Sequence, residues 1–422
     1  MKAGFHTIIA AQFFSSLADN ALFIAAIALL RDMQEPAWMT PALKQSFVLS
    51  YVLLAPLVGA FADSMPKGRV MLYTNGVKVV GCLLMLLLLH PLAAYAVVGF
   101  GAAAYSPAKY GILTELLPPH QLVIANGWIE GATVASIILG VLLGGALISS
   151  YFSPILLHLD VPGVETGIDT APEAAICVIV LVYALAALCN VFIPDTGVDH
   201  RVPSKNPFYL VREFAHCVRL LWRDKLGQIS LATTTLFWGA GATLQVLVFD
   251  WAAKALGMNL SQSSMLQGVV AVGIALGAVL AAKFVTLRSA VKVLPIGVTM
   301  GFIVMTMVLA TQVPLAVMLM IGIGACGGFF VVPMNALLQH RGHVLMGAGH
   351  SIAVQNFNEN IGILLMVGLY ALLMRLGVSV NMAVVLFGAF VSGIMCLVML
   401  RHRHNQAQSD SLHLIGEGKR EH

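Results

Sequence analysis

The chain has 422 residues, of which 59% are hydrophobic and only 10% are charged, and its formal net charge is +4. Soluble domains carry about 25% charged residues, so this composition excludes an ordinary soluble protein. The small, scattered net charge gives no indication of nucleic-acid binding. Together with a mean hydropathy of +0.90, these values indicate a polytopic membrane protein.

Apolar runs long enough to cross a bilayer recur along the whole chain. A spanning helix needs about 20 mostly apolar residues, and it must be a helix because lipid offers no partner to unpaired backbone groups. We therefore predict an all-α polytopic membrane protein with 12 transmembrane helices. The predicted spans lie near residues 7–30, 45–62, 70–89, 93–114, 123–149, 174–193, 228–251, 264–286, 293–312, 314–337, 348–373 and 379–400.

The basic residues predict the orientation of these spans. With the N-terminus in the cytoplasm, seventeen of the 23 Lys and Arg residues fall in cytoplasmic segments, four in outer loops and two within spans. Because Lys and Arg concentrate in cytoplasmic loops, we expect the N- and C-termini to lie in the cytoplasm.

The longest cytoplasmic connection divides the spans into six and six. We predict an N-terminal six-helix half over residues 1–194, a linker over 195–227, a C-terminal six-helix half over 228–401 and a disordered cytoplasmic tail over 402–422. Two six-helix halves are the plan of major facilitator transporters. Within the linker, apolar and basic residues of 207–224 alternate at helical spacing, which favours an amphipathic helix on the anionic inner leaflet. A solvated basic helix is the alternative.

The loop between the second and third spans contains Gly59, Asp63, Lys67 and Arg69. A Gly, an Asp four residues later and a following basic cluster resemble the cytoplasmic motif of major facilitator proteins at this place. We expect a charge latch in which Asp63 meets a helix end or a basic side chain. A positive-inside loop with one stray acid is the alternative.

Polar side chains within the spans are the candidate binding residues. Asp19 and Asn20 lie halfway along the first span, where an Asp costs roughly 2.5–3.5 kcal/mol on insertion scales. Such groups usually face a protein interior or an aqueous cavity. Internal ion pairs that stabilise closed states are the alternative, and Lys78 is interpreted as a snorkelling or packing residue. The candidate substrate-binding residues are Asp19, Asn20, Lys109, Asn126, Glu130, Gln245, Gln355 and Glu359.

Soluble catalytic motifs do not occur in the sequence. There is no ATP-binding Walker A loop, and no His is followed by an acid at the spacing of the His-x4-Asp acyltransferase pattern. We therefore expect a protein that is not an enzyme and that uses no cofactor and no metal.

Five short segments are more specific than the general features above. They are Ala18–Leu22 (ADNAL), Tyr105–Leu113 (YSPAKYGIL), Phe237–Gly241 (FWGAG), Gly327–Pro333 (GGFFVVP) and Ala353–Phe357 (AVQNF). In these segments the chain resembles the lysophospholipid transporter family of bacterial inner membranes, within the major facilitator superfamily. The resemblance extends from about residue 5 to about residue 400.

The resemblance implies a flippase that moves lysophosphatidylethanolamine and related lysolipids from the outer to the inner leaflet by alternating access. It implies a cytoplasmic acyl-ACP synthetase/acyltransferase on a separate chain, because few residues follow the last span. It also implies a phosphate contact for Lys109 and an ammonium contact for Asp19 or Glu359. Members of the family carry an Arg where this chain has Gln245, so a phosphate contact from the seventh span is left open.

Two other functions fit the same residues. Intramembrane acids also serve proton relays and cation binding, so a proton-coupled exporter of amphipathic cations or drugs is one alternative. A membrane scaffold for an acyltransferase is the other. A scaffold has no need of buried charges, and the polar cluster therefore argues against it.

Overall fold

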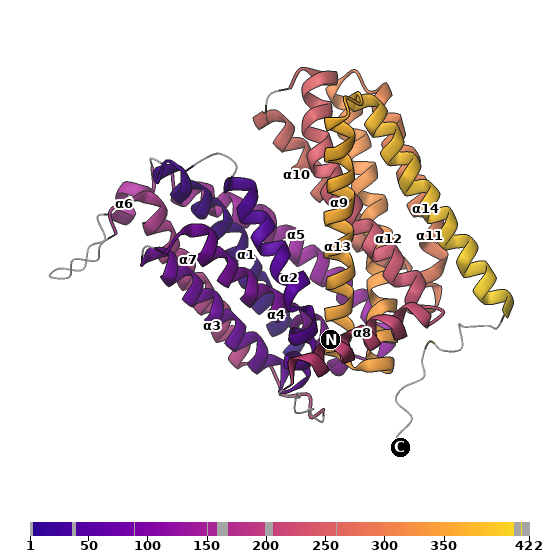
Figure 1. Ribbon diagram of the computed structural model, residues 1–422, viewed down its shortest axis with the longest axis horizontal. Helices are drawn as coiled ribbons and strands as arrows, with labels where there is room; N and C mark the ends of the chain where they lie inside the picture. The colour runs from indigo at the N-terminus through magenta and orange to yellow at the C-terminus, as the bar shows by residue number, and fades with distance from the viewer. Residues whose placement is uncertain are drawn as a thin grey trace. The chain divides into compact units, whose positions relative to one another are not determined.

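The computed structural model describes residues 3–35, 39–87, 89–149, 151–157, 168–198, 206–258, 260–408 and 415. These residues form helices joined by short connections, without a strand in the ranges described (Figure 1). The long helices are α1 (Ala3–Asp32), α2 (Met39–Asp63), α3 (Lys67–Leu86), α4 (Pro91–Leu116), α5 (Leu122–Leu147), α7 (Ala171–Val191), α8 (Pro207–Arg223), α9 (Gly227–Leu256), α10 (Leu260–Phe284), α11 (Leu294–Thr306), α12 (Val313–Met346), α13 (Ala348–Arg375) and α14 (Val380–Gln408). The short ones are η1 (Pro119–Gln121), α6 (Ser153–Leu157), η2 (Leu287–Val293) and η3 (Met307–Leu309).

Each predicted span coincides with one of these helices. Eleven helices within the described ranges are long and apolar enough to cross a membrane. The twelfth predicted span is α4, whose 26 residues make it about 39 Å long at 1.5 Å per residue. Its second half contains the polar residues Ser106 and Lys109. The last span was predicted to end near residue 400, but in the structure α14 continues to Gln408.

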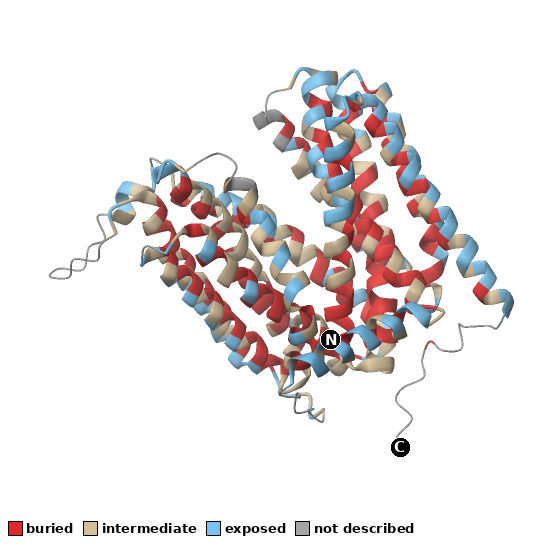
Figure 2. Cartoon of the chain, viewed as in Figure 1, coloured by how far each residue is buried: buried red, intermediate tan, exposed pale blue. Residues whose placement is uncertain are grey.

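Several helices expose large apolar side chains. On α14, Leu386, Leu397 and Leu400 are exposed, and on α7 Leu181 and Leu188 are exposed. Figure 2 shows exposed residues following the length of α14. Apolar surface of this extent is rare on soluble monomers, so these faces agree with a membrane-embedded protein.

The chain divides into two compact units. We call residues 1–112 and 135–211 the N-terminal unit, and residues 113–134 and 212–422 the C-terminal unit. In the N-terminal unit, α7 packs against both α1 and α3. Its core includes Leu22, Cys82 and Tyr183, all fully buried or nearly so. The first part of α5 belongs to the C-terminal unit and the remainder to the N-terminal unit.

Helix pairs form the C-terminal unit: α9 packs on α13, α10 on α12, and α11 on α14. Glycines allow the closest approach. A Cβ at Gly277 would overlap the backbone oxygen of Ala325, and one at Gly328 would overlap that of Ile274. Lipid tails are as apolar as side chains, so such close packing replaces the hydrophobic effect as the driving force between helices.

Replacing two glycines of α12 by Ala should therefore have different effects on the stability of the protein. Gly328→Ala should destabilise the protein by about 1–3 kcal/mol, because an added methyl group overlaps backbone that cannot move aside. Gly322→Ala should leave stability unchanged or raise it by up to ~1 kcal/mol, because a Cβ there meets nothing within 4 Å and Ala is the better helix former. Thermal unfolding of the two purified variants in one detergent measures the difference. Equal midpoints would contradict the packing role of Gly328.

The linker helix α8 packs against other helices of the C-terminal unit. Phe214 and Leu221 are buried, and the Phe214 ring lies edge-on to that of Phe357 at 5.3 Å between centroids. At its end, Asp224 forms a buried ion pair with Arg341 of α12. Arg212 and the other basic residues on the opposite face are exposed. An inner-leaflet position for that face remains a prediction.

Candidate functional site

Asp19 lies in a compact polar cluster inside the N-terminal unit. Lys78 Nζ of α3 donates to both carboxylate oxygens of Asp19, at 2.9 and 2.8 Å. The Tyr183 hydroxyl of α7 donates to Asp19 Oδ1 at 2.6 Å. Lys78 Nζ also donates to Ser15 Oγ at 3.0 Å, and Ser15 Oγ donates to Asn75 Oδ1 at 2.8 Å. Asp19, the acid within the first predicted span, is therefore one half of an ion pair. The side chains that contact this pair come from three helices. We call Ser15, Asp19, Asn75, Lys78 and Tyr183 the Asp19 cluster.

Asp19 is the most exposed member of the Asp19 cluster. The side chain of Lys78 is 1% exposed, whereas that of Asp19 is 20% exposed. Lys78 Nζ also lies 4.9 Å from the centroid of the Tyr105 ring of α4, a favourable cation–π position. A ligand reaching this cluster meets the carboxylate first. An ammonium group could share Asp19 with Lys78, and a phosphate that displaced Asp19 would find the Lys78 cation.

Of the two interpretations of Lys78, snorkelling is wrong, whereas packing inside the protein agrees with its burial. A snorkelling Lys extends its ammonium toward water, but that of Lys78 is buried and pairs with Asp19. The sequence did hold a signal for this pairing. Ser15 and Asp19 are four residues apart, and Asn75 and Lys78 are three apart, so each pair marks one polar face on an otherwise apolar helix.

Asn20 and Lys109 make contacts with residues other than those of the Asp19 cluster. The Asn20 amide donates to the backbone oxygen of Ser16 at 2.8 Å, within α1, and its Cβ lies against Gly140 of α5. Lys109 Nζ lies 4.2 Å from the centroid of the neighbouring Tyr110 ring. Asp19 makes its ion pair with Lys78, not with the Lys109 cation.

A second polar group lies within the C-terminal unit and contains four of the predicted residues. Asn126 of α5 and Gln339 of α12 exchange two hydrogen bonds of 2.9 Å. Glu130, one turn after Asn126, accepts from the Asn335 amide at 3.3 Å. We call Asn126, Glu130, Asn335, Gln339, Gln355 and Glu359 the amide chain. All six are buried.

The amide chain continues from α12 to α13. The Gln355 amide donates to Asn335 Oδ1 at 3.0 Å and to Glu359 Oε1 at 2.8 Å. Asn335 and Gln339 are the members of the amide chain that the list of candidate residues lacks. A signal for Gln339 was its four-residue spacing from Asn335, which equals the spacing of Asn126 and Glu130 on α5 and of Gln355 and Glu359 on α13.

Gln245 lies on an exposed face of α9. Its backbone oxygen accepts from the Gln267 amide of α10 at 2.8 Å. Nearer the end of α9, Asp250 accepts a hydrogen bond of 2.6 Å from the Tyr370 hydroxyl of α13. Gln245 is thus exposed, unlike the six buried members of the amide chain.

The loop between α2 and α3 contains a short ion pair. Lys67 Nζ lies 2.7 Å from Asp63 Oδ1 and also donates to the backbone oxygen of Ala62 at 2.6 Å. The Lys67 side chain is buried, Gly59 is buried and Arg69 is exposed. Asp63 thus pairs with a basic residue of its own loop. This is one of the two contacts expected of a charge latch.

Comparison with known proteins identifies the family. The family model described as Major Facilitator Superfamily matches residues 8–366. The chain belongs to the major facilitator superfamily. The predicted fold class is confirmed, and the superfamily's structures agree: the human organic anion transporter MFSD10 (TETRAN) superposes with a TM-score of 0.72, at 14% identity, over 95% of this chain and 100% of that one.

Curated members of the superfamily are much more similar in sequence. A lysophospholipid transporter LplT from Yersinia enterocolitica (serotype O:8 / biotype 1B) is 44% identical over 381 residues, which cover 90% of this chain and 89% of the relative. A lysophospholipid transporter LplT from Yersinia pestis (strain Pestoides F) is 45% identical over 374 residues, which cover 88% of this chain and 87% of the relative. These relatives confirm the family resemblance predicted from the short segments.

Proposed function

We propose that this protein is a lysophospholipid transporter that moves lysophosphatidylethanolamine and related lysolipids from the outer to the inner leaflet by alternating access. The observation that carries the proposal is the identity of 44–45% to relatives of that name over nearly the full length of both chains. The same relatives and the membrane-spanning helices support a role in transport.

We propose the Asp19 cluster as a headgroup site. A zwitterionic headgroup carries an ammonium and a phosphate, and the ion pair of Asp19 and Lys78 offers a partner for each. The partial exposure of Asp19 supports this assignment, because a carboxylate that only held helices together could be fully buried. Asn20 and Lys109 are further proposed substrate contacts of the N-terminal unit. For the C-terminal unit we separately propose Asn126, Glu130, Gln245, Gln355 and Glu359 as substrate contacts.

The cellular setting is part of the proposal. The excess of Lys and Arg in alternate loops favours cytoplasmic N- and C-termini, and the bacterial relatives favour the inner membrane. A cytoplasmic acyl-ACP synthetase/acyltransferase on a separate chain would re-acylate the lysolipid after it crosses. That step removes the product from the inner leaflet and would draw transport forward. The loop motif of Gly59, Asp63, Lys67 and Arg69 would act as a cytoplasmic gate.

Uptake in spheroplasts tests the function. Labelled lysophosphatidylethanolamine is added outside cells that lack other lysolipid uptake but contain the acyltransferase, and its conversion to the diacyl lipid is followed. Conversion should require this protein. Conversion at the same rate without it would refute the proposal. Loss of uptake at every pH when a protonophore is added would instead favour a proton-coupled transporter.

A further inference from the structure

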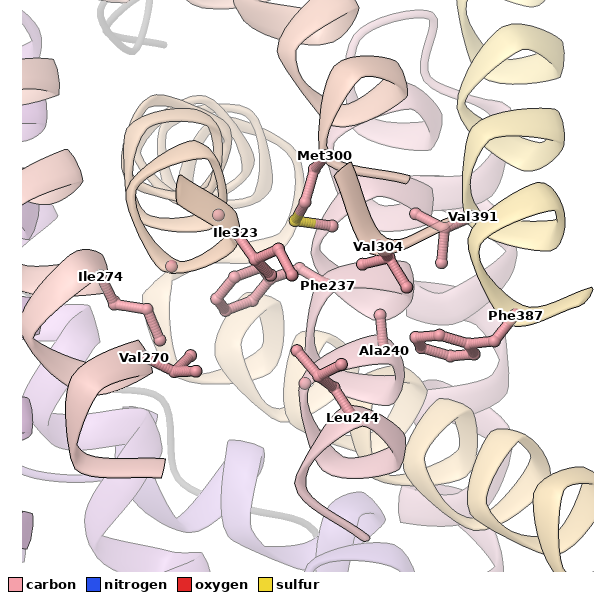
Figure 3. Close-up of a pocket in the computed structure, with 13 residues that line it drawn as sticks. Phe237, Ala240, Leu244, Val270, Ile274, Met300, Val304, Ile323, Phe387 and Val391 are labelled. Carbon is pink, nitrogen blue, oxygen red and sulfur yellow. The ribbon is translucent and has the colours of Figure 1, made fainter. Parts of the chain in front are cut away.

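Two features of the C-terminal unit could bind lipid, an apolar pocket and the exposed face of the linker helix α8. Figure 3 shows the pocket, into which Phe237, Met300 and Phe387 are directed. Its volume is about 50 Å³, which leaves no room for a lipid chain. The exposed face of α8 is therefore the better candidate for binding lipid.

The linker helix lies across α13. Phe214 packs edge-on against Phe357, and the Trp222 indole donates to Asn358 Oδ1 at 3.1 Å. Phe214 and Trp222 are about 12 Å apart along α8, but their partners are only about 1.5 Å apart along the axis of α13. Figure 1 shows the same crossing. Because α13 spans the membrane, a helix that crosses it in this way runs close to the membrane plane.

The position of the crossing along α13 matches the inner surface of the membrane. Ala348 begins α13 on the side predicted to be cytoplasmic, and Phe357 lies about 14 Å further along the helix. The 28 residues of α13 span about 42 Å, about 12 Å more than the hydrocarbon core. With this surplus divided between the two ends, the crossing lies about 8 Å inside the inner boundary of the core, which is the depth of interfacial helices.

The face of α8 directed away from the protein carries a row of arginines. Arg212, Arg219 and Arg223 are all exposed. At about 100° per residue they lie within about 40° of one another around the helix, in a row about 17 Å long. Glu213, the single acid of α8, is half-buried and points about 100° away from Arg212. We call Arg212, Arg219 and Arg223 the arginine row.

Trp222 borders the arginine row. Its side chain is 41% exposed, and it lies about 60° around the helix from Arg219. Trp is typical of the membrane interface, because its ring is apolar and its N–H group is polar. Arg donates to phosphate oxygens through a planar fork of N–H groups. An anionic phospholipid offers a partner to both, a phosphate to the arginines and the boundary of its acyl chains to the Trp222 ring.

We propose that the arginine row of α8 binds the headgroups of anionic phospholipids in the inner leaflet, with Trp222 at the boundary of the acyl chains. A zwitterionic lipid binds there more weakly, because its ammonium cancels the charge of its phosphate. This lipid is a fixed partner of the protein and not its cargo, so the inference does not depend on which solute is transported. Bound lipid also holds α8 in place beside Asp224, the partner of Arg341.

Quenching of Trp222 fluorescence by brominated lipid tests the proposal. The full-length protein is placed in phosphatidylcholine liposomes that contain the same fraction of either brominated phosphatidylglycerol or brominated phosphatidylcholine. The contribution of Trp222 is obtained by subtracting the signal of Trp222→Phe. We expect the anionic lipid to quench Trp222 about twofold more strongly than the neutral one. The excess should disappear in about 1 M NaCl, where the Debye length falls to ~3 Å.

Removing the arginine row should remove the preference. In Arg212→Gln/Arg219→Gln/Arg223→Gln, we expect the two brominated lipids to quench Trp222 equally. These side chains are exposed and Gln is a good helix former, so the variant should unfold at the wild-type temperature in detergent. The salt series on wild-type protein tests the same charge dependence without any substitution.

Lys283→Gln/Arg288→Gln/Lys292→Gln is the matched control. It removes the same number of exposed cations on the same side of the predicted topology but outside α8, and it should keep the excess quenching. Loss of the excess in this control would attribute it to net charge and overturn the proposal. Equal quenching by both lipids in wild-type protein would also overturn it. Quenching by neither lipid would place α8 away from the bilayer, where a protein partner is the alternative occupant.

Discussion

Replacing Lys78 with Met should abolish lysolipid uptake and destabilise the protein by about 3–5 kcal/mol, the range for breaking a buried ion pair from one side. Lys78 is 1% exposed and donates to both oxygens of Asp19. Without it, the Asp19 carboxylate keeps the Tyr183 hydroxyl but loses its cation. Thermal unfolding of the purified variant and spheroplast uptake are the measurements.

The double variant Asp19→Asn/Lys78→Met separates folding from binding. Removing both charges should recover most of the lost stability, because a neutral pair of similar volume is often as stable as a buried ion pair. Transport should stay lost if the pair receives the headgroup. A double variant that folds and transports at the wild-type rate would mean that Asp19 and Lys78 only hold helices together.

Replacing Arg341 with Met should release the linker helix α8 and cost a similar ~3–5 kcal/mol. Arg341 donates to Asp224 through Nε at 3.2 Å and Nη2 at 2.7 Å, and both side chains are at most 10% exposed. Asp224 also accepts from the backbone of Gly227 at 2.7 Å, where α9 begins. One carboxylate therefore holds the end of the linker and the start of the next span.

Limited trypsin digestion reports on this release. Cleavage after Arg219 or Arg223, at the end of α8, should become faster in Arg341→Met than in wild type. Arg288→Met is the control, because Arg288 is exposed on the same side of the predicted topology and surface substitutions usually change stability by less than ~0.5 kcal/mol. Unchanged digestion in Arg341→Met would mean that other contacts suffice to hold α8.

The sequence predicted the spans and the polar positions but not which side chains meet. Apolar runs locate a membrane helix because its length and composition are set by the bilayer, independent of neighbours. The partner of Asp19 depends on the rotation of α3 relative to α1. A single Lys such as Lys78 among apolar residues does not reveal that rotation. The three-residue spacing between Asn75 and Lys78 is only a weak indication of it.

The amide chain was predictable in the same partial way. Asn126, Glu130, Gln355 and Glu359 were candidates because they are polar side chains within predicted spans. That Gln339 of α12 completes the chain depends on which helices pack together, and the sequence distance of 213 residues between Asn126 and Gln339 gives no hint of it.

The glycine contacts between α10 and α12 bear on how the protein is assembled. These helices pack together, with Gly277 and Gly328 against backbone of the opposite helix, yet α11 is synthesised between them. When α10 enters the bilayer, its closest partner does not yet exist, and its small-residue face must meet lipid until α12 follows. We therefore expect this stretch of the nascent chain to be the one most dependent on insertion factors that shelter unpaired helices.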